Sequence, residues 1–203
     1  MKKPLIILTG PTAVGKTKLS ISLAQAVNGA IISADSMQVY RHMDIGSAKI
    51  RPEEMCGVPH YLIDVLDPSE EFHVVKFVEL AHEAMEKIYA AGQIPIVTGG
   101  TGFYIQALLK EVDFTESHGE LPIRKQLEEK AATEEGAAEL YRELSEVDPA
   151  SAETIHPNNV KRVIRALEYY HETGQKISEH NEEQKQKESP YCSAYFVLND
   201  ERS

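Results

Sequence analysis

The chain of 203 residues has a formal net charge of −11, with 42% hydrophobic and 26% charged residues. This composition is ordinary for a globular protein, and no run of eighteen apolar residues is present that could cross a membrane. The negative charge argues against indiscriminate nucleic-acid binding, because proteins that grip phosphates widely are usually basic; RNA contact would need a local basic patch. The two cysteines, Cys56 and Cys192, provide neither a disulfide framework nor metal-ligand spacing, so we expect a cytoplasmic protein.

Predicted strands and helices alternate over the first half of the chain. A continuous apolar run at 5–9 predicts a strand buried on both faces of a parallel sheet, and a helix over 16–27 follows and stops at Asn28-Gly29. Apolar residues at helical spacing predict a second helix over 72–91, capped by Gly92. The remaining strands are predicted at 30–33, 61–65 and 94–98. This alternation predicts an α/β fold with functional sites at the carboxyl ends of its strands.

The turn after the first strand carries a phosphate-binding sequence. The P-loop pattern G-x-x-x-x-G-K-[ST] is matched without a mismatch by Gly10, Pro11, Thr12, Ala13, Val14, Gly15, Lys16 and Thr17. Its glycines let backbone N–H groups surround an anion, Lys16 adds a charge at the terminal phosphate, and the Thr17 hydroxyl can bind Mg²⁺. The loop predicts polyphosphate binding in a P-loop NTPase-like, doubly wound parallel sheet. It does not identify the reaction, because kinases, nucleotide hydrolases and enzymes that release diphosphate all use such a loop.

Two aspartates follow predicted strands and are candidates for the chemistry. Asp35 follows the strand at 30–33, and it would lie beside the phosphate loop if the first two strands are neighbours. It could bind Mg²⁺, accept a proton as a general base, or simply stabilise the Asp35-Ser36 turn. Asp64 follows the apolar residues at 61–63 and is a second candidate on the metal side, with an ordinary loop role as the alternative. The spacing alone does not choose among these roles.

The composition changes at about residue 115, where helical patterns replace the alternation of strands and helices. Residues 115–190 contain 17 acidic and 10 basic residues and almost no β-branched runs. The stretch at 195–198 indicates a return to strand. We therefore predict a core formed by 1–114 and 191–203, interrupted by a helical insertion domain at 115–190.

One predicted helix of the insertion presents a row of basic side chains. It begins after Pro157 and ends before Gly174. Its apolar face consists of Val160, Val163, Ile164 and Leu167. Away from that face, a cationic strip able to contact a few phosphates would be formed by Lys161, Arg162 and Arg165. From the residues alone, a solvated helix face is the more frequent explanation of such a strip.

Several segments together are more specific than the phosphate loop. They are DSMQVYR at 35–41, DIGSAK at 44–49, GGTGFYI at 99–105, and IHPNN at 155–159, which leads to Arg162, Arg165 and the sequence ALE at 166–168. Together with the loop, they resemble the tRNA dimethylallyltransferase family, whose members prenylate N6 of the adenosine next to the anticodon, at position 37. The resemblance covers essentially the whole chain. Members of this family generally continue well past Ser203, so we expect a chain that is truncated at its C-terminus.

The resemblance implies roles for individual residues. Asp35 matches the general base that accepts a proton from the adenine amino group, and Thr101 matches a residue at the phosphate end of the reaction channel. The P-loop would hold dimethylallyl diphosphate with Mg²⁺, and the anticodon stem-loop of tRNA would present the target base by flipping it out. Arg202 lies near the place where the family has an arginine directed towards the diphosphate. The implied tRNA contacts are Asp35, Ser36, Met37, Gln38, Thr101, Arg124, Lys161, Arg162, Val163, Ile164 and Arg165.

The chemistry of these residues fits the resemblance. The amino group of adenine is a poor nucleophile because its lone pair is delocalised into the ring. Stabilisation of a departing diphosphate by the loop, Lys16 and Mg²⁺ would therefore supply most of the catalysis, and Asp35 would accept a proton late. The alternative is a small-molecule or nucleoside kinase that holds ATP in the same loop and activates a hydroxyl with Asp35. We further expect a monomer with no membrane segment.

Overall fold

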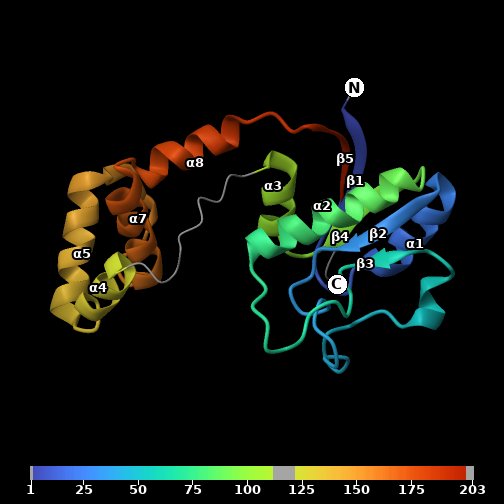
Figure 1. The fold of residues 1–203 in the computed structure, drawn as a ribbon, viewed down its shortest axis with the longest axis horizontal. Helices are drawn as coiled ribbons and strands as arrows, with labels where there is room; N and C mark the ends of the chain where they lie inside the picture. The colour runs from blue at the N-terminus through green and yellow to red at the C-terminus, as the bar shows by residue number, and fades with distance from the viewer. Residues whose placement is uncertain (1, 112–121, 200–203) are drawn as a thin grey trace. The chain divides into compact units, whose positions relative to one another are not determined.

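The computed structural model describes residues 2–111 and 122–199 (Figure 1). The chain forms two compact units, residues 1–112 with 188–203, and residues 113–187. The first unit contains a β-sheet with helices, and the second contains helices alone among its described residues. The predicted boundary at 114–115 lies outside the described residues, and so does Arg202. No helix within the described ranges is both long enough and apolar enough to span a membrane.

A parallel five-stranded sheet forms the first unit. Its strands are β1 (Lys3–Thr9), β2 (Gly29–Ser33), β3 (His60–Tyr61), β4 (Ile94–Gly99) and β5 (Tyr191–Val197). They lie in the order β3-β2-β4-β1-β5, and every pairing is parallel. All the carboxyl ends therefore meet at one edge of the sheet, which is where sites form in such folds. β1 and β2 are not neighbours, because β4 lies between them.

Helices cover both faces of this sheet. The strand residues Ile31 and Ile96 pack with Ala24 of α1 (Lys16–Val27) on one face. The next residues along the same strands, Ile32 and Val97, pack on the other face with α2 (Val74–Ala90) and α3 (Gly102–Lys110). Successive side chains of a strand point to opposite faces, so continuous apolar runs are buried on both sides. The predicted doubly wound α/β fold is confirmed (Figure 1).

Two predicted strands differ clearly in extent from the observed ones, whereas the ends of the other three agree to within two residues. The third was expected at 61–65, but it ends at Tyr61 because Leu62 and Asp64 adopt positive φ angles of 62° and 55°, which no strand contains. The last was expected at 195–198, but it begins at Tyr191 and pairs with β1 along its whole length. The missed residues at 191–194 (Tyr-Cys-Ser-Ala) do not form a continuous apolar run, so the pattern indicated only the more apolar end of the strand.

The second unit is a small helical bundle with its own core. Its helices are α4 (Pro122–Lys130), α5 (Glu134–Val147), α6 (Pro149–Thr154), α7 (Val160–Thr173) and α8 (Ile177–Gln186). α7 begins after Asn159 and ends at Gly174, whose left-handed backbone (φ 71°) terminates the helix as predicted. The buried apolar residues that join the helices are Leu127, Leu140, Leu144, Ala152, Val163, Ile164, Ala166 and Leu167.

A buried aspartate ties three of these helices together. Asp148 lies between α5 and α6, and its two carboxylate oxygens accept hydrogen bonds from the backbone N–H groups and hydroxyls of Ser151 and Ser178 at 2.6–3.1 Å. Burial by itself raises the pKa of Asp148, but the hydrogen bonds from Ser178 and Ser151 outweigh it and hold that pKa below its ordinary value. The charged carboxylate therefore stabilises the bundle.

Replacement of Asp148 by Asn should destabilise the helical unit by about 1–3 kcal/mol, because an amide cannot accept all four hydrogen bonds. The pKa of Asp148 is lowered on folding, so its contribution is present above the unfolded pKa of about 4 and is lost as the pH falls through the folded value. Amide hydrogen exchange in α6 and α8 should therefore differ between the variant and the wild type at pH 7, and much less at the lowest pH that preserves the fold. The exposed Glu153→Gln on α6 is the control. An equal difference at both pH values would contradict a role for the charge.

Candidate active site at the carboxyl ends of the strands

The phosphate loop connects β1 to α1 as predicted. Gly15 precedes the helix with a φ of 89°, and Gly10 leaves the strand with a φ of 151°. A Cβ at Gly10 would lie 2.3 Å from the carbonyl oxygen of Leu198, which follows β5 and whose N–H donates to the Thr9 carbonyl at 2.7 Å. Only glycine fits at this crossing, so the neighbouring strand fixes the start of the loop.

The ammonium group of Lys16 lies against the loop itself. Its Nζ donates to the carbonyls of Gly10 and Pro11 at 2.8 and 2.6 Å. Burial lowers the pKa of Lys16, and the nearby charge of Asp35 opposes this effect. Asp35 is thus within electrostatic range of Lys16 although β4 separates their strands. The Lys16 ammonium is therefore hydrogen-bonded within the loop in this structure.

Asp35 has the turn role that its position allowed, and one of its oxygens is left over. Its Oδ1 accepts hydrogen bonds from the backbone N–H groups of Met37 and Gln38, at 2.8 and 3.3 Å, which stabilises the turn after β2. Its Oδ2 has no hydrogen-bond partner among the described residues. One oxygen therefore positions the carboxylate, and the other remains able to accept a proton or to bind a metal ion.

Thr101 reaches the same edge of the sheet from β4. A Cβ at Gly99 would lie 2.4 Å from the Ala34 carbonyl, so glycine permits the ends of β2 and β4 to come together. Thr101 precedes α3, and its side chain makes no capping hydrogen bond to that helix. The structure thus brings together Lys16, Asp35 and Thr101 at the ends of three adjacent strands.

The Gln38 side chain has a structural role, because its amide forms hydrogen bonds to two separate segments. Its Oε1 accepts a hydrogen bond from the Ser33 hydroxyl at 3.0 Å, and its Nε2 donates to the carbonyls of Ser47 and Ala48 at 3.4 and 3.2 Å. The amide therefore joins the end of β2 to the loop at 43–49. Ser36 and Met37, by contrast, are exposed.

Asp64 forms an ion pair with Lys49, a pairing that the sequence analysis did not predict. The Lys49 ammonium donates to Asp64 Oδ1 at 2.5 Å, Asp44 Oδ1 at 2.8 Å and the Tyr40 carbonyl at 2.8 Å. Burial of Lys49 lowers its pKa, but the two carboxylates prevail and raise it above its ordinary value. This geometry gives Asp64 a structural role in the loop. The sequence held no local signal for the pairing, because Lys49 and Asp64 are far apart along the chain.

The predicted RNA contacts of the helical unit divide into three kinds. Lys161, Arg162 and Arg165 are exposed, and within the described residues none of them forms an ion pair. Val163 and Ile164 are only 1% and 5% exposed and belong to the core of the bundle, so their side chains cannot form part of a contact surface. They were named as RNA contacts only because the matching segment is continuous, and their burial confirms the apolar face that the helical spacing predicted.

The third kind is Arg124, which is already paired. Its guanidinium lies 3.2 Å from Glu128 and 3.4 Å from the buried carboxylate of Glu168 on α7. Burial raises the pKa of Glu168, and the Arg124 charge opposes that change. Arg124 therefore joins α4 to α7 in this structure.

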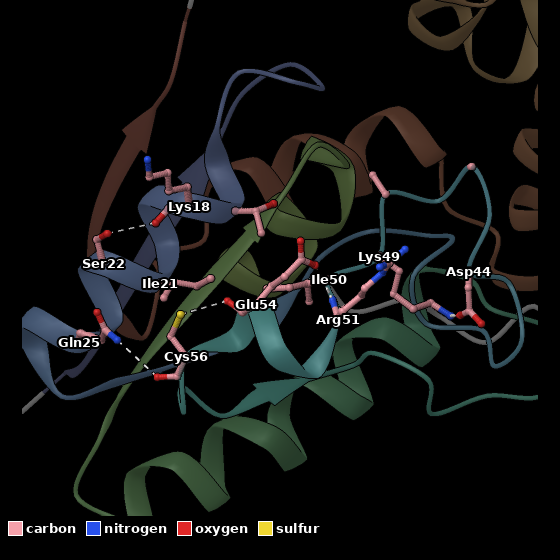
Figure 2. Close-up of a pocket in the computed structure, with 13 residues that line it drawn as sticks. Lys18, Ile21, Ser22, Gln25, Asp44, Lys49, Ile50, Arg51, Glu54 and Cys56 are labelled. Atoms are coloured by element: carbon pink, nitrogen blue, oxygen red, sulfur yellow. Dashed lines mark hydrogen bonds and ion pairs between the residues drawn. The ribbon is translucent and has the colours of Figure 1, made fainter.

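A cavity of about 1100 Å³ adjoins the phosphate loop (Figure 2). One wall is formed by Lys18, Ser22 and Gln25 of α1, and the opposite wall by the segment 44–56, which includes the 3-10 helix η1 (Pro52–Met55). The Gln25 amide donates to the Cys56 carbonyl at 3.4 Å and joins the two walls. Thr17 lines the cavity at its phosphate-loop end. Both cysteines are free and exposed.

The donors at the phosphate loop suit a magnesium ion that is held mainly by substrate. Thr17 is exposed in the first turn of α1, and Asp35 has one carboxylate oxygen without a partner in the described chain. No group of three or more His, Cys, Asp or Glu side chains in the described ranges could hold a metal alone. Mg²⁺ is usually bound by one or two protein oxygens together with substrate phosphates and water, so the available donors fit that mode.

Comparisons with known proteins agree with this geometry. Residues 38–203 match the family described as IPP transferase. The tRNA dimethylallyltransferase of Lachnoclostridium phytofermentans is 65% identical over 200 residues, which cover 98% of this chain and 64% of that protein. The tRNA dimethylallyltransferase of Bacillus anthracis is 51% identical over 183 residues, covering 90% and 58% of the two chains. This chain thus spans less than two thirds of the length of these relatives.

Solved structures resemble the chain over nearly all its length. A eukaryotic dimethylallyltransferase acting on tRNA superposes with a TM-score of 0.84 at 40% identity and covers 97% of this chain and 48% of its own. The tRNA isopentenylpyrophosphate transferase of Bacillus halodurans has a TM-score of 0.60 at 43% identity, with 97% and 60% covered.

Proposed function

The chain belongs to the IPP transferase family, and on this premise we propose that it transfers a dimethylallyl group from dimethylallyl diphosphate to N6 of adenosine 37 in tRNA. The observation that carries the proposal is the meeting of a P-loop, a carboxylate with one unpartnered oxygen and a threonine at the ends of three strands. A kinase would need the same loop, but the similarity to tRNA dimethylallyltransferases over 98% of the chain favours prenyl transfer.

The phosphate loop would bind the diphosphate of the prenyl donor. Backbone N–H groups at the start of α1 and the Lys16 ammonium stabilise the negative charge that grows as the bond from carbon to the diphosphate oxygen breaks. Mg²⁺, held by Thr17 and the phosphates, would supply further charge stabilisation. Lys16 leaves the carbonyls of Gly10 and Pro11 and binds the leaving group, and Thr101 borders the diphosphate from the end of β4.

Asp35 would act as the base. As the bond between N6 and the allylic carbon forms, the amino nitrogen becomes acidic, and Oδ2 of Asp35 accepts its proton. The Met37 and Gln38 N–H groups hold the other oxygen, so the carboxylate keeps its orientation throughout. The diphosphate leaves with the electron pair of the broken bond, and the product is a neutral secondary amine on the base.

The target adenine must leave its stack to reach this carboxylate, since a stacked base does not expose its amino group to a closed site. The exposed Ser36 and Met37 beside Asp35 would contact the flipped nucleotide, and the exposed cations of α7 would bind phosphates of the anticodon stem-loop. Cytoplasmic location and a monomeric state stay predictions of the sequence.

One incubation tests the reaction. The chain is mixed with dimethylallyl diphosphate, Mg²⁺ and an anticodon stem-loop, and the RNA is analysed by mass spectrometry. A gain of one dimethylallyl group, absent when the target adenosine is replaced by inosine, supports the proposal. Consumption of ATP with phosphorylation of a small acceptor, and no change in the RNA, would support the kinase instead.

Replacement of Arg162 and Arg165 together by Ala should weaken stem-loop binding by about 10-fold at moderate salt and lower the slope of log K against log[salt] by about 1.5, since each lost phosphate contact contributes about 0.7–0.9. Fluorescence anisotropy at several salt concentrations measures both quantities. Arg142→Ala, which removes an exposed arginine of α5, is the control. An unchanged slope in the double variant would remove these arginines from the interface.

A further inference from the structure

The loop at residues 43–49, here called the Ile45 loop, exposes an apolar side chain completely. Ile45 is 101% exposed, the highest value among the large hydrophobic residues that the structure describes as exposed. Single exposed apolar residues are common and need no explanation by themselves. Ile45 differs because the loop that carries it is held in place by many hydrogen bonds.

Side chains anchor the Ile45 loop on both sides of the isoleucine. Before it, the Met43 carbonyl accepts a hydrogen bond from the Ser47 hydroxyl at 2.6 Å, and Asp44 is bound by Lys49 at 2.8 Å. After it, the carbonyls of Ser47 and Ala48 accept from the Gln38 amide. The Lys49 side chain is only 5% exposed and also binds Asp64 and the Tyr40 carbonyl. A loop built in this way presents Ile45 in a defined position.

The anchor connects the Ile45 loop directly to the proposed catalytic carboxylate. Asp35 accepts the backbone N–H of Gln38, and the Gln38 side chain holds the loop at Ser47, two residues beyond Ile45. Met37, 43% exposed, lies in the same turn as Asp35. Figure 1 shows this connection between β2 and β3 extending away from the sheet. The exposed side chain of Ile45 therefore belongs to the same connection as Asp35 and Met37, which would contact the flipped adenosine under the proposed function.

We propose that Ile45 is a base-contacting residue, which packs against a nucleobase of the RNA loop beside the flipped target adenosine. Flipping leaves a neighbouring base with an uncovered face, and proteins that unstack bases commonly cover such faces with apolar wedges such as Ile, Leu or Met. Covering the base removes both apolar surfaces from water, which favours the complex. The inference rests on the proposed function, because it requires RNA as the occupant.

The test uses the 203-residue chain and an anticodon stem-loop that carries 2-aminopurine next to the target adenosine, on either side in two separate RNAs. Ile45→Ala should weaken stem-loop binding by about 10-fold and change the fluorescence of one of the two RNAs in its complex. Ile45→Met should restore both values, because Met also offers an apolar wedge. Leu19→Ala on α1, where the leucine is 44% exposed, is the matched control. The melting temperature of Ile45→Ala should equal that of the wild type, since no buried contact is lost.

The outcomes separate this inference from the proposed function. If the wild type prenylates the stem-loop but Ile45→Ala binds it with unchanged affinity and fluorescence, the base contact is wrong and the reaction stands. If the wild type neither binds nor prenylates the stem-loop, the proposed function is wrong, and the base contact of Ile45 is then wrong as well. If the wild type self-associates in light scattering without RNA and Ile45→Ala does not, a second copy covers Ile45 and the base contact is overturned.

Discussion

Replacement of Asp35 by Asn is expected to lower the rate of prenyl transfer by about 10²- to 10⁴-fold, the usual contribution of a positioned general base. The amide oxygen of Asn can still accept the N–H groups of Met37 and Gln38, so the turn after β2 should persist. In the variant, an NH₂ group takes the place of Oδ2, and this group cannot accept the proton from the adenine amino group. Single-turnover measurements with saturating dimethylallyl diphosphate and stem-loop give the rate of the chemical step directly.

The same variant separates the two chemical roles left open for Asp35. A base should affect the rate and leave the affinity for the diphosphate within about twofold of the wild type. If diphosphate affinity falls together with the rate, and more Mg²⁺ restores it, the carboxylate serves the metal ion instead. Glu86→Gln, an exposed position on α2, controls for the loss of one negative charge.

Replacement of Lys16 by Met should lower kcat by about 10²- to 10³-fold and weaken diphosphate binding as well. Under the proposed function, the ammonium would leave the carbonyls of Gly10 and Pro11 and stabilise the charge that develops on the leaving group. Removal of one such donor has effects of this size. Met keeps the length and flexibility of the side chain without its charge. Steady-state kinetics with the stem-loop, together with diphosphate titrations, measure both effects. An intact kcat would place the phosphates away from the loop.

The pH dependence gives this prediction an independent readout. Burial lowers the pKa of Lys16, and Asp35 only partly offsets that change. The charged form should therefore bind diphosphate below this pKa, and kcat/KM of the wild type should fall as the pH rises through it in the alkaline range. In Lys16→Met this alkaline decline should disappear, because no proton is lost there. Lys87→Met at the end of α2 should retain the wild-type profile.

The sequence alone determined the parts of the protein that depend on consecutive residues. The P-loop and the limits of α1 followed from glycines and apolar spacing within about twenty residues, as did the end of α7 at Gly174. Asp35 could be placed at a strand end for the same reason. Local backbone preferences and burial patterns act over short distances along the chain, so a single sequence records them.

Only the tertiary structure decided which of these residues meet. It placed β4 between β1 and β2, yet kept Asp35 within electrostatic reach of Lys16. It paired Asp64 with Lys49, Gln38 with the Ile45 loop, and Arg124 with the buried Glu168 of α7. The partner of a charged or polar side chain is chosen by packing and desolvation among segments distant in the sequence, and no local pattern records that choice.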